Sequence, residues 1–240
     1  SQTYPADDRV RNNVALIRQY LGQYEKATSE ERESIRLDPT FAVNYSNLML
    51  DYMALNRLDE AKAVYREAIE QKRDHVFLHD NMYLISFLQG DIEEMKRQAA
   101  WVRGQPGAED VLLSAESDTQ AFYGRMAKAR ELARQAVDSA RRAQLKETAA
   151  QWQLNLALHE AEFGNSQRAQ QEADAGLALA STRDAQIMAA LALAQAGGSA
   201  RAQTLSEQLE KQHPLNTAIT GYWLPAIRAY LEIHRGNAAQ

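Results

Sequence analysis

Large apolar residues recur along this chain at helical spacing, and residues 44–69, NYSNLMLDYMALNRLDEAKAVYREAI, show the pattern most completely. Tyr45, Leu48 and Tyr52 are three and four residues apart, which places them on one face of a helix. Beyond the polar segment that follows, Ala61 and Tyr65 repeat the spacing, and the small Ala61 allows a second helix to approach the first closely. The stretch therefore predicts two helices joined by a tight turn.

The residues expected at the turns repeat with a fixed period. Gly22, Asn56, Gly90 and Gly124 are 34 residues apart each time, and Asn is the side chain that best replaces Gly in a left-handed conformation. The next turn glycine, Gly164, follows after 40 residues. Because neither 125–142 nor 147–163 contains a helix breaker, we expect the six extra residues to lengthen the helices there.

Together these patterns predict an all-α fold, a right-handed αα superhelix of about six helical hairpins plus one extra helix. We expect a kink or restart of the last helix at Pro225, close packing of the Ala-rich fifth hairpin, and a local irregularity at Met95, where a small residue is expected. The pattern begins inside one repeat and stops inside another, so we expect a segment of a longer protein. We predict a single solenoid over residues 1–240, with repeats at about 8–39, 42–73, 76–106, 109–143, 146–181 and 183–214 and a partial repeat at 215–240.

Composition and charge narrow the function classes. The chain is 45% hydrophobic and 25% charged, and its net charge of −5 is spread without a basic tail, which argues against nucleic acid as a partner. It contains no Cys, which excludes disulfides and thiolate metal sites but fits cytoplasm and periplasm equally. No apolar run approaches the ~18 to 20 residues of a membrane span.

The residues of the second repeat carry a family resemblance. Tyr45, Leu48, Tyr52, Ala61 and Tyr65 match the spacing W-x2-L-G-x2-Y…A-x3-F, with Tyr in place of Trp and Met49 in place of Gly, so the chain resembles the tetratricopeptide repeat superfamily. That resemblance implies an interaction scaffold. A subset of the superfamily clamps the carboxylates of chaperones, but only Asn47 matches that clamp and its cations are missing, which excludes this ligand.

A narrower resemblance is to the C-terminal repeat arrays of bacterial eukaryotic-like serine/threonine protein kinases; similar arrays also follow winged-helix regulators. The runs that carry it include LHDNMYLISFLQGD, ETAAQWQLNLALHEAEFGN and YWLPAIRAYLEI. It implies the regulatory or sensing region of a larger bacterial signalling protein, with a kinase or DNA-binding module and often a membrane span elsewhere. The sequence has no Gly-rich phosphate loop, HRD or DFG, and we expect no catalytic residues and no cofactor.

The resemblance also implies a partner-binding groove on the first helix of each hairpin. An apolar groove of this kind would bury an amphipathic helix or an extended segment of a protein partner. The same pattern equally fits residues buried in the protein's own core, and both interpretations stay open here. The groove-facing positions are Leu16, Tyr20, Leu50, Met53, Phe77, Leu84, Phe87, Asp118, Phe122, Leu154 and Leu158.

Two further motifs have ordinary explanations. His75 and His79 are four residues apart, a spacing that metal sites use, but without a third ligand we expect a helix start capped by Asp74, with His79 packed on the preceding repeat, and no metal. Basic residues concentrate in 125–146, which fits a solvated face better than an anionic partner. The sequence thus leaves three functions: binding a peptide or protein segment, self-association as a homodimer, and sensing a small ligand.

Overall fold

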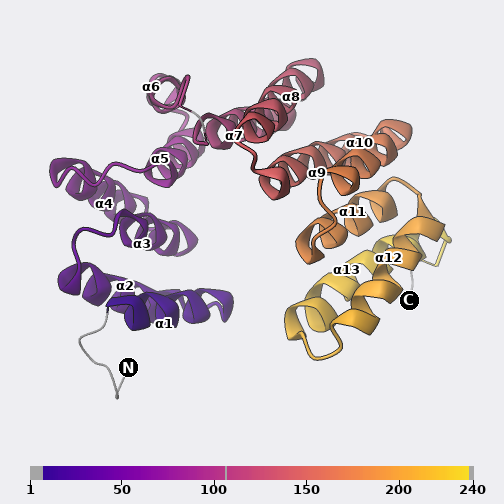
Figure 1. The fold of residues 1–240 in the computed structure, drawn as a ribbon, viewed down its shortest axis with the longest axis horizontal. Helices are drawn as coiled ribbons and strands as arrows, with labels where there is room; N and C mark the ends of the chain where they lie inside the picture. Colours follow the sequence, from indigo (N-terminus) through magenta and orange to yellow (C-terminus); the bar gives the residue numbers. More distant parts are fainter. Residues whose placement is uncertain (1–7, 106, 238–240) are drawn as a thin grey trace. The chain divides into compact units, whose positions relative to one another are not determined.

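A computed structural model describes residues 8–105 and 107–237, which form thirteen α-helices and one π-helical turn with no β-strand (Figure 1). The all-α fold class, with six hairpins of paired helices and one extra helix, is confirmed. Residues 1–7, 106 and 238–240 of the predicted solenoid, including the expected end of the third repeat, lie outside the described residues.

The chain divides into two compact units, Ser1–Arg103 and Gly104–Gln240, within the segment where GQPGAED interrupts the helical pattern. The single solenoid over residues 1–240 stays a prediction. The helices of the first unit are α1 (Asp8–Tyr20), α2 (Tyr24–Leu37), α3 (Ala42–Ala54), α4 (Leu58–Glu70), α5 (Val76–Gln89) and α6 (Ile92–Trp101). Those of the second are α7 (Glu109–Phe122), α8 (Met126–Arg142), α9 (Lys146–Glu162), α10 (Ser166–Leu179), α11 (Arg183–Gln195), α12 (Ser199–Gln212), η1 (Ile219–Trp223) and α13 (Leu224–His234).

The predicted turn residues adopt the left-handed backbone that a tight helix–helix turn requires. Gly22 has φ of 69°, Asn56 56°, Gly90 72°, Gly124 71° and Gly164 73°. In each of these turns, the amide of the following residue closes the end of the first helix, as the Arg57 amide does by donating to the Tyr52 carbonyl at 2.8 Å. The 34-residue period therefore reports the positions of the turns correctly.

The core of the first unit is built by the apolar stripe of residues 45–68. Tyr45, Leu48 and Met49 are fully buried, and they pack with Ala61 and Val64 of α4. The Tyr45 hydroxyl donates to the Gln71 side-chain oxygen at 2.7 Å, so the buried ring keeps a satisfied polar end. The third hairpin places Met95 in the core, and its α6 is only 10 residues long. The irregularity expected at Met95 stays a prediction.

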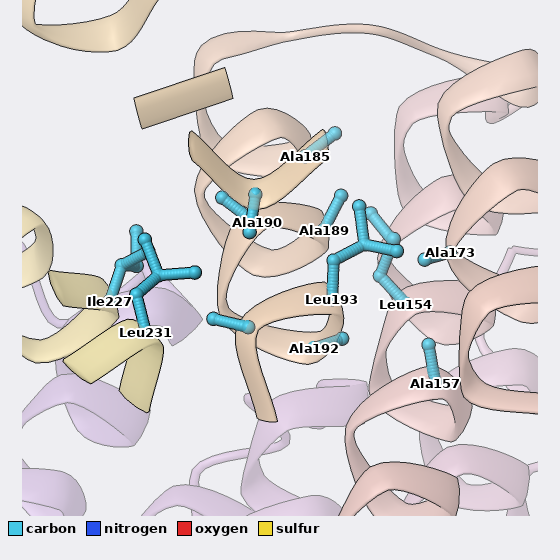
Figure 2. Packing of buried hydrophobic residues seen from close by; sticks show 12 residues of the cluster. Leu154, Ala157, Ala173, Ala185, Ala189, Ala190, Ala192, Leu193, Ile227 and Leu231 are labelled. Atoms are coloured by element: carbon cyan, nitrogen blue, oxygen red, sulfur yellow. The ribbon is translucent and has the colours of Figure 1, made fainter. Parts of the chain in front are cut away.

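In the second unit, α11 packs between α9 and α13 (Figure 2). Leu193 faces Leu154 of α9, and Ile227 and Leu231 of α13 cover the other side of the cluster. A Cβ atom at Gly176 of α10 would lie 2.6 Å from Leu154 Cγ, so only glycine permits this approach of α10 to α9. Close packing of the Ala-rich hairpin is thus confirmed.

Two further expectations concern the length of α8 and α9 and the position of Pro225. Helices α8 and α9 contain 17 residues each, against 13 or 14 in most others, and this accommodates the longer spacing before Gly164. The last helical segment passes from a π-helical turn at Ile219–Trp223 directly into an α-helix at Leu224, and Pro225 lies in the first turn of that α-helix. Pro225 therefore coincides with the restart of the helix.

Candidate functional site

The predicted groove residues lie on the first helices of the hairpins, and most of them reach solvent. Tyr20 is 90% exposed, Phe122 72%, Phe77 47% and Leu50 45%. Leu16, Met53, Leu84, Phe87, Asp118 and Leu158 are half-buried. Large apolar side chains that are exposed in this way present a surface that another molecule can contact.

Leu154 differs from the other predicted lining residues because it is fully buried. It belongs to the cluster of the second unit and packs on Gly176 and Leu193. Leu158, one turn later on α9, is only half-buried at the edge of the same cluster. Leu154 has a packing role and forms no part of the exposed surface.

In the first unit, side-chain amides connect the first helices of successive hairpins. Gln19 of α1 donates to the Asn47 carbonyl of α3 at 3.3 Å, and Asn81 of α5 donates to the Ser46 carbonyl of α3 at 2.9 Å. These bonds hold α1, α3 and α5 beside one another in a common register. Leu16, Leu50 and Leu84, each six residues before a turn residue, therefore occupy equivalent positions on three neighbouring helices.

In the second unit, Asp118 belongs to a charged cluster between α7 and α9. The His159 Nε2 atom lies 2.9 Å from Asp118 Oδ1, and its Nδ1 atom lies 3.2 Å from Glu162 Oε2. Burial alone lowers the pKa of His159, but the hydrogen bonds to both carboxylates outweigh it and raise that pKa above the ordinary value. Asn155 also donates to Asp118, at 3.3 Å. Asp118 thus gives this part of the surface a polar, charge-paired character.

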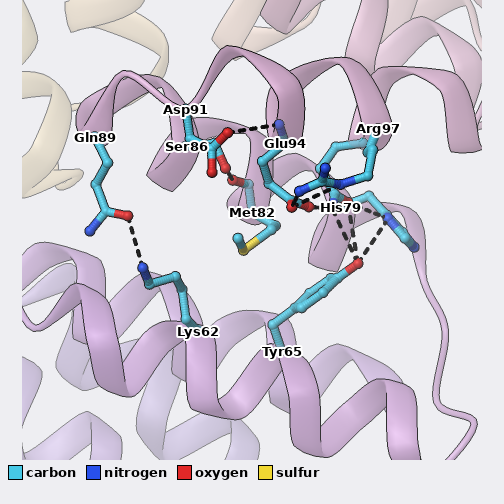
Figure 3. A network of polar contacts seen from close by, with 10 residues as sticks. Lys62, Tyr65, His79, Met82, Ser86, Gln89, Asp91, Glu94 and Arg97 are labelled. Atoms are coloured by element: carbon cyan, nitrogen blue, oxygen red, sulfur yellow. Dashed lines mark hydrogen bonds and ion pairs between the residues drawn. The ribbon is translucent and has the colours of Figure 1, made fainter.

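The buried side chain of His79 is held by polar and aromatic neighbours, among them Tyr65 (Figure 3). Its imidazole is buried, lies 2.6 Å from Asp74 Oδ1 and 2.5 Å from Gln98 Oε1, and stacks on Trp101 at 3.7 Å between ring centroids. Tyr65 of the preceding hairpin meets it edge-on, as expected for packing on the preceding repeat. The expected cap is wrong: His75 accepts the Phe77 amide, because Asp74 is held by His79.

Within residues 8–105 and 107–237, no group of three or more His, Asp or Glu side chains is placed to hold a metal ion. In the same residues, no helix combines the length and apolarity that crossing a membrane demands.

The basic segment of α8 is partly neutralised by carboxylates: Arg130 forms two bonds to buried Glu160, and Lys128 pairs with Glu131 at 2.9 Å. Burial raises the pKa of Glu160, but the bonds from Arg130 and Asn165 hold it below its usual range.

Sequence reasoning missed one group of polar residues, the buried carboxyls of Glu31 and Asp51. The repeat register contained a signal for the first. Glu31 is nine residues after Gly22, the position that Tyr65 occupies nine residues after Asn56, so a carboxyl stands where an aromatic ring belongs. Asp51 lies between Leu50 and Tyr52 in an otherwise apolar run.

Comparison with known proteins agrees with this architecture. A family model described as tetratricopeptide repeat matches residues 52–75. None of the curated proteins compared with the chain matches it. Among solved structures, Pseudomonas aeruginosa PilF is 14% identical, with a TM-score of 0.51, over 90% of this chain and 96% of its own.

Two other solved structures are similar to the same extent. PilW, described as a widely conserved type IV pilus biogenesis factor, is 16% identical, with a TM-score of 0.51, over 89% of this chain and 97% of its own. A signal transduction ATPase with a tetratricopeptide repeat sensor from Pyrococcus horikoshii is 16% identical, with a TM-score of 0.57, over 95% of this chain but 38% of its own. At these identities the likeness concerns the fold alone: this chain has the helical-repeat fold of tetratricopeptide proteins.

Proposed function

We propose that the chain is a non-catalytic protein–protein interaction scaffold that binds an amphipathic or extended segment of a protein partner along the first helices of its hairpins. The observation that carries this proposal is the set of exposed apolar side chains on those helices, with Tyr20 and Phe122 the most exposed. Aromatic side chains of this kind contribute strongly to binding because they bury a large area at little cost in conformational entropy.

The arrangement in the first unit supports an elongated ligand. Leu16, Leu50 and Leu84 recur on three neighbouring helices that side-chain amides hold in register. A bound segment would meet an apolar contact at each hairpin, the spacing that helix-in-groove and extended-peptide recognition use. Phe77 and Tyr20 provide larger exposed surfaces on the outer helices of the same three.

We further propose that this array is the regulatory or sensing part of a larger bacterial signalling protein, a serine/threonine kinase. The support is the resemblance of its repeat runs to the C-terminal arrays of such kinases. Isolation of the endogenous protein with an antibody against this array, followed by peptide mass spectrometry, tests the proposal. Peptides with kinase motifs in the same chain are expected, and a purified protein without such peptides would refute it.

Peptide selection tests the binding function directly. A displayed library of random peptides is selected against the chain, and the affinity of the enriched peptides is measured by fluorescence anisotropy for the wild type, Tyr20→Asp and Phe122→Asp. A charge placed on a buried apolar contact should weaken binding about tenfold or more at whichever position the peptide covers. Both side chains are exposed, so the melting temperature should stay within about 2 °C of the wild type.

Leu215→Asp is the matched control because Leu215 is 93% exposed but lies outside the first helices of the hairpins. It should leave every affinity unchanged. Equal affinity for the wild type and both groove variants would refute binding at this surface.

Light scattering over a hundredfold range of concentration distinguishes self-association from binding of a foreign partner. A dimer that Tyr20→Asp or Phe122→Asp dissociates would make a second copy the ligand of this surface.

A further inference from the structure

Two carboxyl groups lie inside the first unit, where helices α1, α2 and α3 meet. Glu31 is on α2 and Asp51 is on α3, and both residues are fully buried. The charges are close enough for Asp51 to contribute to the raised pKa of Glu31. Core positions of this kind ordinarily hold apolar residues, as Tyr65 shows at the place equivalent to Glu31 in the next hairpin.

The hydrogen bonds to this pair are few and long. Asn12 of α1 and Asn47 of α3 both donate to Glu31 Oε1, each at 3.4 Å. Glu31 Oε2 and both oxygens of Asp51 have no hydrogen-bond partner among the residues described here. An ionised carboxylate left in this state has lost its hydration without a replacement, which costs several kcal/mol.

The surrounding cations are committed elsewhere. Arg11 and Arg18 of α1 pair with Glu30, the neighbour of Glu31, at 2.6 Å and 3.0 Å. The side chains that act on the pair are the amides of Asn12, Asn47 and Gln19, and within the described part of the chain no charged group of α4 or α5 contributes to either carboxyl. Among the described residues, no cation therefore forms an ion pair with Glu31 or Asp51 or lowers the pKa of either.

Protonation removes this imbalance. Burial, together with the Asp51 charge, raises the pKa of Glu31 to about 8 against the opposing hydrogen bonds of Asn47 and Asn12. Burial likewise raises the pKa of Asp51 to about 6, although the side-chain amide of Gln19 favours the ionised form and partly lowers that pKa. A neutral carboxylic acid can stay inside the unit at a far smaller cost than its anion.

We propose that the packing of α1 and α2 onto α3 is coupled to proton uptake by Glu31 and Asp51, so that this end of the first unit tightens in acid and loosens in alkali. The pair is thus a pH-sensitive element built into the first two hairpins. It requires no ligand, and its two carboxyl groups are buried residues outside the binding surface proposed above.

The direction follows from proton binding in the two states. An unfolded chain titrates these carboxyls at their ordinary values near 4, whereas the folded unit keeps the protons up to about pH 6 and about pH 8. Between those limits the folded state binds more protons, so its stability falls as pH rises. Above about pH 8 both forms are ionised and the full destabilisation is present.

The readout has to be local, because His159 gives the second unit a pH dependence of its own. Hydrogen exchange with mass spectrometry meets this need: protection factors, corrected for the intrinsic rate at each pH, are followed for peptides from 24–37 and 42–54. In the wild type they should fall about tenfold or more between pH 6 and pH 8.5, since one bound proton changes stability by up to tenfold per pH unit. Glu31→Gln with Asp51→Asn should reduce this fall to less than about threefold.

Glu33→Gln is the matched control, because it removes a carboxylate of the same helix that pairs with Arg36 at 2.7 Å and does not act on Glu31 or Asp51, and it should keep the wild-type slope. If the double variant does not fold at pH 6, Glu31→Gln alone provides the comparison and should remove most of the fall between pH 6 and pH 8.5, because Asp51, with a pKa of about 6, loses its proton at the start of this range. Protection that is independent of pH in the wild type, or that falls equally in the double variant, would overturn the proposal. So would a gain in wild-type protection at pH 8.5 on adding Ca²⁺ or Mg²⁺, which would make the pair a cation site instead.

Discussion

Gly176 permits a sharp test of how α10 packs on α9, because the effect of Gly176→Ala on the free energy of unfolding should change sign when Leu154 is shortened to alanine. A Cβ atom at this position would lie 2.6 Å from Leu154 Cγ and 2.8 Å from Leu154 Cδ2. Both distances are far below van der Waals contact, and Leu154 is fully buried within its cluster, so the side chain has no space to move away.

Two opposing terms determine the effect of Gly176→Ala on the free energy of unfolding. Alanine is the better helix former by about 1 kcal/mol in a helix interior. Overpacking a filled core costs about 1–3 kcal/mol. We expect a net destabilisation of about 1 kcal/mol, so that a substitution that ordinarily stabilises a helix should here weaken the second unit.

Removing Leu154 should reverse the result. Leu154→Ala deletes the atoms that the new methyl group would meet and should by itself destabilise the unit by about 2–5 kcal/mol. In that background, Gly176→Ala keeps its helix propensity and fills part of the cavity, so it should stabilise by about 1 kcal/mol. The coupling energy between the two positions should then reach about 2 kcal/mol.

Urea unfolding followed by circular dichroism gives the four free energies of this cycle, and hydrogen exchange of peptides from α9 and α10 assigns the change to the second unit. Gly221→Ala is the control, since a Cβ atom there would meet nothing within 4 Å and no loss of stability is expected. A stabilisation of about 1 kcal/mol by Gly176→Ala in both backgrounds would show that α10 and α9 are not as close as described.

Two other predictions concern charges in the second unit. Because the pKa of His159 is raised, its bonds to Asp118 and Glu162 should stabilise the second unit below about pH 6.5, the ordinary His value. This contribution should be lost as pH rises through the higher pKa of the folded state, which an NMR titration of the His159 C2 proton should report. His159→Gln should abolish this part of the pH dependence of hydrogen-exchange protection in α9. Arg130→Met should lower the free energy of unfolding in urea by about 3 kcal/mol, because it leaves the buried carboxylate of Glu160 without its ion-pair partner. Lys128→Met breaks an ion pair whose two side chains are exposed and should cost less than about 1 kcal/mol. Equal losses in the two variants would contradict the different burial of the two pairs.

The sequence predicted the parts of the fold that depend on local backbone chemistry. A left-handed turn accepts Gly or Asn and little else, so Gly22, Asn56 and Gly90 identified the hairpins without any knowledge of their packing. The long interval before Gly164 likewise predicted the two longer helices that lie within it, α8 and α9. Pro225 predicted a kink or restart of the last helix, because its ring removes an amide donor and crowds the preceding turn, and the α-helix begins one residue before it.

Residue-level features that depend on contacts between hairpins were less predictable. Leu154 and Leu158 have the same chemistry and lie one turn apart, and only the approach of α10 at Gly176 and of α11 makes the first fully buried. Asp74 was expected to cap α5, but the burial of His79 against Tyr65 and Trp101 brings its ring to that carboxylate. Both outcomes depend on residues distant in the sequence.

In the first unit, the acid pair and the proposed binding surface are linked through α3, which carries residues of both on different faces. Asp51 points into the unit, while the preceding residue, Leu50, is exposed on the outer face of α3. Gln19 acts on Asp51 and also donates to the Asn47 carbonyl, one of the bonds that hold α1 beside α3. A helix moves as a rigid element, so any loosening around an ionised Asp51 must also shift Leu16 relative to Leu50.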